Sequence, residues 1–130
     1  MLRCAITDRS LLPGDESQKQ SRLLENAARW ARSGIDLIQL REKDLSAGGQ
    51  VELAKKILEI TATEASATRL VLNAAPAIAL EVAAHGVHLP AHSPLRPHDI
   101  RRRYAKANLP PPIVTVSCHT LAEIHIARRN

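Results

Sequence analysis

The sequence predicts an α/β fold with a parallel sheet, and two observations support this prediction. Apolar runs alternate with amphipathic helical stretches almost five times, at roughly 20 to 35 residues per unit, as in parallel strands joined by right-handed crossovers. The chain also has no Phe, one Trp and one Tyr. Its core must therefore consist of Ala, Leu, Ile and Val, a composition typical of helices packed closely on a parallel sheet. We expect one domain, residues 1–130.

Each expected strand is a short apolar run bounded by polar or turn-forming residues. The strands are expected at residues 2–8, 35–40, 68–73, 86–90 and 112–119. A Pro13-Gly14 break follows the first of them, which indicates a loop before the first helix.

The expected helices follow these strands and carry recognisable start and stop signals. They are expected to begin at Ser17, Ser46, Pro76, close to Pro97, and at Thr120. Gly34 suits the C-cap of the first helix, and Gly86 is expected to terminate the third. Glu123 lies three residues after Thr120, in the position of a capping box.

Two architectures fit this alternation. An open doubly wound sheet would be complete with five strands, whereas a (β/α)8 barrel would lack its last three units, since such barrels usually need upwards of about 200 residues. No Gly-x-Gly-x-x-Gly or Walker loop follows the first strand. Nothing in the sequence therefore supports a nucleotide-binding version of the open sheet.

Composition restricts the classes of ligand and the compartment. The formal charge of +5 favours anionic ligands such as phosphate esters. Only Trp30 and Tyr104 could stack on bases, so we do not expect nucleic acid as a partner. Cys4 and Cys118 are expected to be buried free thiols, as in a reducing compartment. No signal peptide or membrane-spanning stretch is recognisable, so we expect a cytoplasmic protein that binds no membrane.

Polar residues gather after the strands, where ligands bind in both architectures. These residues are Asp8, Gln39, Arg41, Lys43, Asn73, His88, His92, Ser117 and His119. Strand alternation places Gln39 and Arg41 on one face, and Lys43 continues that direction. An amide, a guanidinium and an ammonium together suit a diphosphate.

The charged segment from residue 41 to residue 44 also allows an ordinary surface interpretation. In a ligand site, Glu42 and Asp44 would face away from the anion. In a solvated loop, they would instead pair with Arg41 and Lys43. Spacing alone leaves both alternatives open.

Four segments, in this order, resemble one family over essentially the whole chain. They read "IQLREKDLS", "LVLN", "AIALEVAAHGVHLP" and "VTVSCHTLAE". This pattern resembles the thiamine phosphate synthase and thiazole tautomerase (TenI) superfamily. The resemblance implies the (β/α)8-barrel fold, of which the chain would contain about the first five βα units. It also implies an enzyme of thiamine biosynthesis that joins hydroxymethylpyrimidine diphosphate to thiazole phosphate and releases pyrophosphate.

The resemblance also assigns roles to residues. It implies that Gln39, Arg41, Lys43 and Asn73 hold the pyrimidine diphosphate, and it adds Ser117 to the substrate-binding set. In the synthase branch, Mg²⁺ is expected as a cofactor, bound by two Asp residues. The corresponding positions here are Ala74 and Ser93, which cannot replace carboxylates as ligands of a hard cation, so we expect no metal site.

Two other functions therefore stay open. In the tautomerase branch, a His after the fifth strand moves a proton, and that residue falls on His119. The third possibility is an inactive relative that retains phosphate binding or has a regulatory role. The family continues with three further strands, so a five-strand fragment would expose two sheet edges. We expect self-association to cover these edges.

Overall fold

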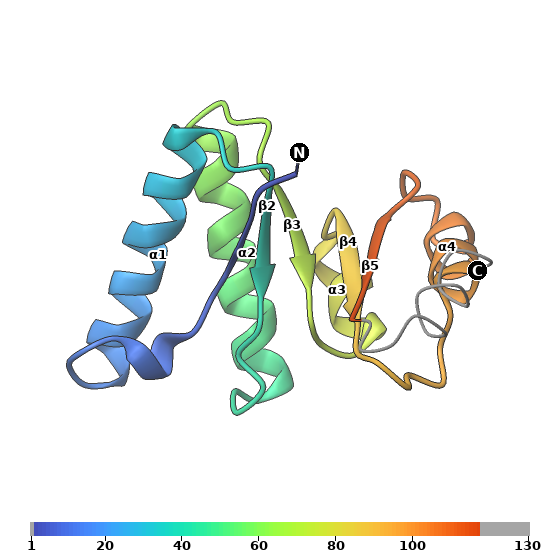
Figure 1. Cartoon of the computed structure of the whole chain (residues 1–130), viewed down its shortest axis with the longest axis horizontal. Helices are drawn as coiled ribbons and strands as arrows, with labels where there is room; N and C mark the ends of the chain where they lie inside the picture. The colour runs from blue at the N-terminus through green and yellow to red at the C-terminus, as the bar shows by residue number, and fades with distance from the viewer. Residues whose placement is uncertain (1, 118–130) are drawn as a thin grey trace.

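The computed structural model describes residues 2–117 and contains one sheet of five parallel strands. The strands are β1 (Cys4–Ile6), β2 (Leu37–Leu40), β3 (Arg69–Leu72), β4 (Gly86–Leu89) and β5 (Ile113–Val116). They lie side by side in chain order, β1-β2-β3-β4-β5 (Figure 1). A doubly wound sheet reverses its strand order at a switch point, whereas a barrel adds each strand next to the preceding one. The open doubly wound alternative is therefore excluded.

The strands are connected by helices that pack on one face of the sheet (Figure 1). The helices are η1 (Arg9–Leu11), α1 (Glu16–Ser33), α2 (Ala47–Thr63), α3 (Pro76–Val82) and α4 (Pro97–Lys106). Asp15 caps α1 by accepting a hydrogen bond from the Gln18 N–H, and Gly34 ends it with a φ of 81°. Ser46 caps α2 by accepting from the Gly49 N–H. The expected starts of the first four helices are thus confirmed to within a residue.

The apolar core lies between the sheet and this helical layer. Alternate strand residues, among them Ile38, Leu70 and Val87, are completely buried there. Ile57 of α2 and Ile100 of α4 complete the same cluster from the helices. The other strand residues point to the opposite face of the sheet, which would be the inner face of a barrel.

Gly86 has a different role from the one expected. Helix α3 ends at Val82, with Ala83 in the left-handed conformation at a φ of 53°. Gly86 instead begins β4, where an added Cβ would lie 1.9 Å from the carbonyl oxygen of Ile113. The prediction of Gly86 as a helix terminator was therefore wrong. The residue is glycine because β5 approaches β4 too closely for a side chain.

One further expectation near the N-terminus was wrong. Cys4 is exposed rather than buried, because it belongs to the edge strand β1 and faces away from the helices, in register with Leu37. Asp8 is also exposed. Its carboxylate accepts a hydrogen bond of 3.1 Å from the Ser10 N–H and caps η1. Cys118 and the helix expected at Thr120 lie outside the described residues. Within residues 2–117, no helix is long and apolar enough to cross a membrane.

Candidate functional site

The strand register brings polar residues together on the inner face, at the carboxyl ends of the strands. Leu72 is in register with Val87, and His88 with Thr115. Asn73 comes directly after Leu72, and His88 comes directly after Val87. Asn73 and His88 are therefore neighbours across β3 and β4, and both point to the inner face, where His88 lies beside Thr115. Gln39, in register with Val71, points in the same direction one layer below. This polar layer is where barrel enzymes bind their ligands.

Gln39 and Asn73 form a buried amide pair. The Asn73 Nδ2 group donates a hydrogen bond of 3.1 Å to the Gln39 side-chain oxygen. Their exposed fractions are 5% and 8%, so the two predicted site residues are fixed relative to each other. The Gln39 amide nitrogen and the Asn73 side-chain oxygen are not used in this bond. Together they can present a donor and an acceptor to a heteroaromatic ring.

His88 lies between two hydroxyl groups of β5 and the segment after it. Its Nδ1 shares a hydrogen bond of 2.6 Å with the Thr115 hydroxyl, and its Nε2 shares one of 2.7 Å with the Ser117 hydroxyl. Partial burial lowers the pKa of His88, and the positive charges of Lys43 and Arg41 lower it further. Both cations are therefore close enough to the ring of His88 to act on its charge.

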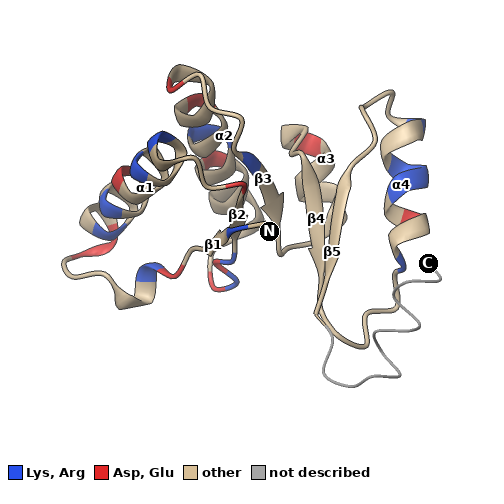
Figure 2. Ribbon diagram, turned by 45° about the horizontal axis from the view of Figure 1, so that its top comes forward, with Lys and Arg blue, Asp and Glu red and all other residues tan. Residues whose placement is uncertain are grey.

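Arg41 and Lys43 are both exposed and have no ion-pair partner within residues 2–117. Figure 2 shows acidic and basic residues alternating in the turn after β2. The acidic residues of that turn are bound elsewhere, by Arg9. The alternative in which Glu42 and Asp44 neutralise Arg41 and Lys43 was therefore wrong. The two cations remain available to an anion.

Arg9 is a buried arginine that binds three carboxylates. Its Nη1 donates to Glu42 at 3.0 Å and to Asp44 at 2.7 Å, and its Nη2 donates to Asp44 at 2.9 Å. Its Nε donates to Glu16 at 2.7 Å. Glu42 is only 4% exposed. The hydrogen bonds from Arg9 lower the pKa of Asp44. For Glu16, whose pKa is also lowered, the Gln20 amide contributes more than Arg9 does.

A hollow of about 360 Å³ opens beside this polar layer. Lys43, Gln50, Asn73, Ala74 and Pro90 are among its lining residues. Its position between the ends of β2, β3 and β4 agrees with a ligand site of the predicted kind.

The residues present do not fit the magnesium ion that the resemblance implies. Ala74 lines the hollow with a methyl group, and the Ser93 hydroxyl accepts a hydrogen bond of 3.1 Å from the Leu95 N–H. In the described part of the chain, no three His, Cys, Asp or Glu residues are grouped so that they could hold a metal ion. The expectation of no metal among the site residues stays a prediction, since residues 118–130 are not described.

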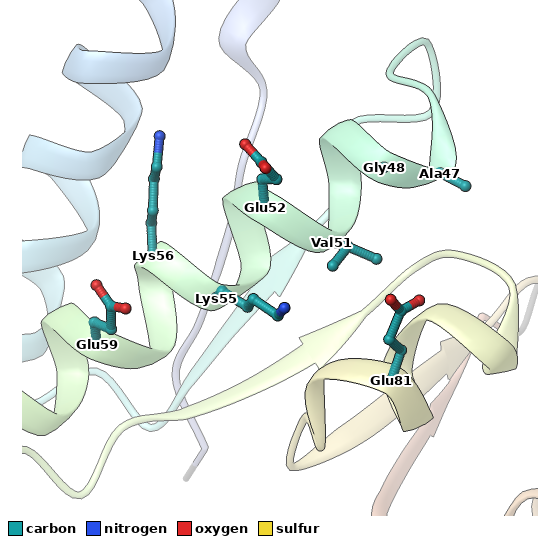
Figure 3. A pocket seen from close by; sticks show the side chains of 8 residues that line it. All are labelled: Ala47, Gly48, Val51, Glu52, Lys55, Lys56, Glu59 and Glu81. Atoms are coloured by element: carbon teal, nitrogen blue, oxygen red, sulfur yellow. The ribbon is translucent and has the colours of Figure 1, made fainter.

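A groove of about 480 Å³ lies between α2 and α3, on the helical side of the sheet (Figure 3). Lys55 and Glu81 point toward each other across it, while Lys56 and Glu59 point away (Figure 3). Its charges are of both signs, so it offers less to an anion than the polar layer does.

The structure thus brings five of the six predicted site residues to one end of the sheet. They are Gln39, Arg41, Lys43 and Asn73, and Ser117 joins them through His88. The sixth, His119, lies outside the described residues. Sequence reasoning placed His88 at this end of the sheet without giving it a role, and it missed Arg9. Strand alternation could have placed His88 on the inner face, whereas nothing local indicates the partners of Arg9.

Comparisons with known proteins agree with this geometry. The thiamine-phosphate synthase of Clostridium acetobutylicum is 32% identical over 125 residues, which cover 96% of this chain and 53% of that protein. The thiamine-phosphate synthase of Caldanaerobacter subterraneus is 36% identical over 85 residues, 65% of this chain and 36% of that protein. The chain therefore spans about half the length, or less, of these curated relatives.

A solved structure shows the same fold. The thiamine phosphate pyrophosphorylase from Pyrococcus furiosus superposes with a TM-score of 0.75 at 21% identity, covering 98% of this chain and 55% of that one. In addition, residues 4–130 match the TMP-TENI family, described as thiamine monophosphate synthase. The chain belongs to the thiamine monophosphate synthase family.

Proposed function

We propose that this chain carries the pyrimidine diphosphate-binding part of a thiamine phosphate synthase. The observation that supports this proposal is that the cations and the carboxylates of the turn after β2 do not pair with each other. Arg41 and Lys43 are free of ion pairs within residues 2–117, while the intervening carboxylates are bound to Arg9. A diphosphate is a dianion or trianion that such a pair of cations can bind.

Each residue of the polar layer has a role in this proposal. The Gln39–Asn73 pair binds the pyrimidine ring, and Arg41 and Lys43 bind the diphosphate. When the thiazole nitrogen bonds to the methylene carbon of the pyrimidine, the bond from that carbon to the diphosphate oxygen breaks, and pyrophosphate leaves with the electron pair. The two cations stabilise the negative charge that grows on the leaving group. Ser117, held by His88, supplies a further hydroxyl.

A calorimetric titration with hydroxymethylpyrimidine diphosphate, with and without Mg²⁺, tests this proposal. Because Ala74 and Ser93 are not carboxylates, we expect binding that does not depend on Mg²⁺. A chain that binds neither this compound nor pyrophosphate would contradict the assignment of Arg41 and Lys43. Binding together with a complete lack of thiamine phosphate formation would support the inactive phosphate-binding relative.

Thiazole tautomerase activity is the second candidate, because Ala74 and Ser93 argue against the magnesium-dependent reaction. In this candidate, His119 moves a proton on the thiazole carboxylate phosphate. A coupled assay on the thiazole carboxylate tautomer, repeated with His119→Ala, tests it. An unchanged rate in the variant would remove His119 from catalysis.

We also propose that a second copy of the chain covers the sheet edges. Within the described residues, β1 and β5 each pair on one side only. Ile6 of β1 is 54% exposed, and Leu2, which precedes this strand, is 74% exposed. Sedimentation of the full chain tests this proposal. A single monomeric species at micromolar concentration would contradict it.

A further inference from the structure

We propose that Arg9 is the positioning residue of the diphosphate site: by binding Glu42 and Asp44, it prevents both carboxylates from neutralising Arg41 and Lys43. This inference rests on the proposed function for its ligand. Its electrostatic part can be tested without any ligand.

The sequence of the turn makes such a residue necessary. Charges of opposite sign alternate from Arg41 to Asp44, so each cation has a carboxylate as its nearest neighbour along the chain. In solution, flexible neighbours of opposite charge pair readily and compete with an external anion. A site built on this turn therefore needs a way to hold its own carboxylates elsewhere.

Arg9 meets this need through its geometry. Its planar fork binds the two oxygens of Asp44 from Nη2 and Nη1, and Nη1 also binds Glu42. The side chain of Arg9 is only 9% exposed and is held from the other side by Glu16 of α1. Through these contacts, Arg9 joins the segment after β1 to the first turn of α1 and to the loop after β2. A lysine at this position could not make the bidentate contact.

Loss of this guanidinium would affect the two acids differently. Glu42 would still accept hydrogen bonds from the main-chain N–H of residue 9, at 3.2 and 3.3 Å. Asp44 would lose both of its bonds to Arg9. The cations nearest to it in sequence are then Lys43 and Arg41, and Lys19 is a further competitor, because its charge already lowers the pKa of Asp44.

His88 reports the state of the two cations without ligand. Burial lowers its pKa, and so do the charges of Lys43 and Arg41. If Asp44 or Glu42 pairs with either cation, the positive potential at His88 falls, and the pKa of His88 rises toward its ordinary value.

The experiment compares Arg9→Met in the full chain with Arg32→Met, because Arg32 is exposed and forms an ion pair with the half-buried Glu64, away from the turn after β2. Binding of inorganic pyrophosphate is measured by calorimetry, and the pKa of His88 is measured by NMR in the absence of ligand. We expect Arg9→Met to weaken binding about fivefold, the upper range for pairs of exposed charges, and to raise the pKa of His88. The Arg32 variant should change neither.

Rescue separates positioning from a purely structural role. Adding Glu42→Gln and Asp44→Asn to Arg9→Met removes the competing charges, so pyrophosphate affinity and the pKa of His88 should return to their wild-type values. A folded triple variant that still binds pyrophosphate weakly would overturn the inference. So would an Arg9→Met variant in which both the pyrophosphate affinity and the pKa of His88 are unchanged.

If Arg9→Met does not fold, Asp44→Asn with Arg9 intact then tests the inference. Because Arg9 already holds Asp44 away from the cations, this variant should bind pyrophosphate with unchanged affinity, and a fivefold gain in affinity would refute the inference. If the wild-type chain fails to bind pyrophosphate, the proposed function loses its support, while the His88 measurement still shows whether Arg9 keeps the acids from the cations.

Discussion

The two ends of the sheet treat their polar groups in opposite ways. At the amino end, the His85 Nδ1 accepts a hydrogen bond of 2.9 Å from the Leu70 N–H, and the Tyr104 hydroxyl donates one of 2.9 Å to the Ala84 carbonyl. At the carboxyl end, Arg41 and Lys43 have no ion-pair partner within residues 2–117. The amino end uses its polar groups for stability, and the carboxyl end keeps some of them available for binding.

The difference extends to the histidines, which lie three residues apart. His85 is at the amino end of β4 and His88 near its carboxyl end. Burial lowers the pKa of both, and for His85 the charge of Arg69 adds to this effect. His85 must keep Nδ1 unprotonated to accept from Leu70, so its role is fixed by the fold. The two ring nitrogens of His88 are hydrogen-bonded to the hydroxyl groups of Thr115 and Ser117, which can act as donors or acceptors.

The largest expected effect comes from the amino end, with Gly86→Ala. A Cβ at this position would lie 1.9 Å from the Ile113 carbonyl oxygen and 2.9 Å from its nitrogen, so β4 and β5 would have to separate. We expect the free energy of unfolding to fall by about 3 kcal/mol, the upper range for overpacking. Urea denaturation followed by circular dichroism measures it.

Gly48→Ala is the matched control for that substitution. Gly48 lies in the first turn of α2, and a Cβ there would meet no atom within 4 Å. The alanine should therefore stabilise the protein, by about 0.5 to 1 kcal/mol, because it restricts the unfolded chain. Equal destabilisation by both alanines would show that the close approach of β5 does not explain Gly86.

The second effect belongs to the carboxyl end, with the double substitution Arg41→Gln and Lys43→Gln. Each cation removed should weaken binding of hydroxymethylpyrimidine diphosphate about tenfold, as expected for charge-assisted hydrogen bonds, and both together about a hundredfold. The free energy of unfolding should change by less than about 0.5 kcal/mol, since both side chains are exposed. Titration calorimetry and urea denaturation measure the two quantities. If the double variant loses stability but keeps its affinity, Arg41 and Lys43 contribute to stability and not to binding, which would contradict the proposed difference between the two ends.

The sequence predicted those features that depend on local patterns. Strand and helix alternation, the start of the second helix at Ser46, the C-cap at Gly34 and the polar residues after each strand all follow from neighbours in the chain. Gly86 shows the limit of this reasoning, because a glycine after an apolar helical run has the same local signature whether it ends a helix or begins a strand. The contact that decides comes from Ile113, which lies far along the chain.

The site shows the same limit. Charge alternation from Arg41 to Asp44 allows either pairing within the turn or pairing elsewhere, and the outcome depends on Arg9, more than thirty positions away. The hydroxyl partners of His88 likewise come from β5 and the residue directly after it, 27 and 29 positions along the chain. These contacts depend on how the βα loops meet at the end of the sheet, which no local pattern specifies.

The third effect concerns the amino end again, with Tyr104→Phe. The variant leaves the Ala84 carbonyl without its buried donor, so we expect the free energy of unfolding to fall by about 1 kcal/mol. Diphosphate affinity should not change, because Tyr104 lies at the opposite end from Lys43. Urea denaturation and calorimetry check the two expectations.

Tyr104 also gives the alkaline limit of stability. Burial raises its pKa to about 12, whereas tyrosine in an unfolded chain titrates near 10. The folded state therefore favours the neutral phenol, and its contribution is fully present below about pH 10 and is lost as the pH rises toward about 12. The phenylalanine variant should lack this part of the alkaline stability loss. An identical pH profile for both proteins would contradict the assignment.

The smallest effect tests the carboxyl end most directly, with Lys43→Gln and the pKa of His88. Among the charges, Lys43 contributes more than Arg41 to the lowered pKa, although burial contributes most, so removal of Lys43 should raise the pKa only in part. NMR titration of the ring, with His88→Gln to assign the signal, measures the shift.

Lys56→Gln is the control, because Lys56 lies on the helical side of the sheet (Figure 3). Solvent and salt screen exposed charges, so the rise should shrink at high ionic strength. A pKa that does not move, or that moves equally in the control, would mean that Lys43 does not lie over the polar layer, and the two ends would then differ in packing without differing in their capacity to bind an anion.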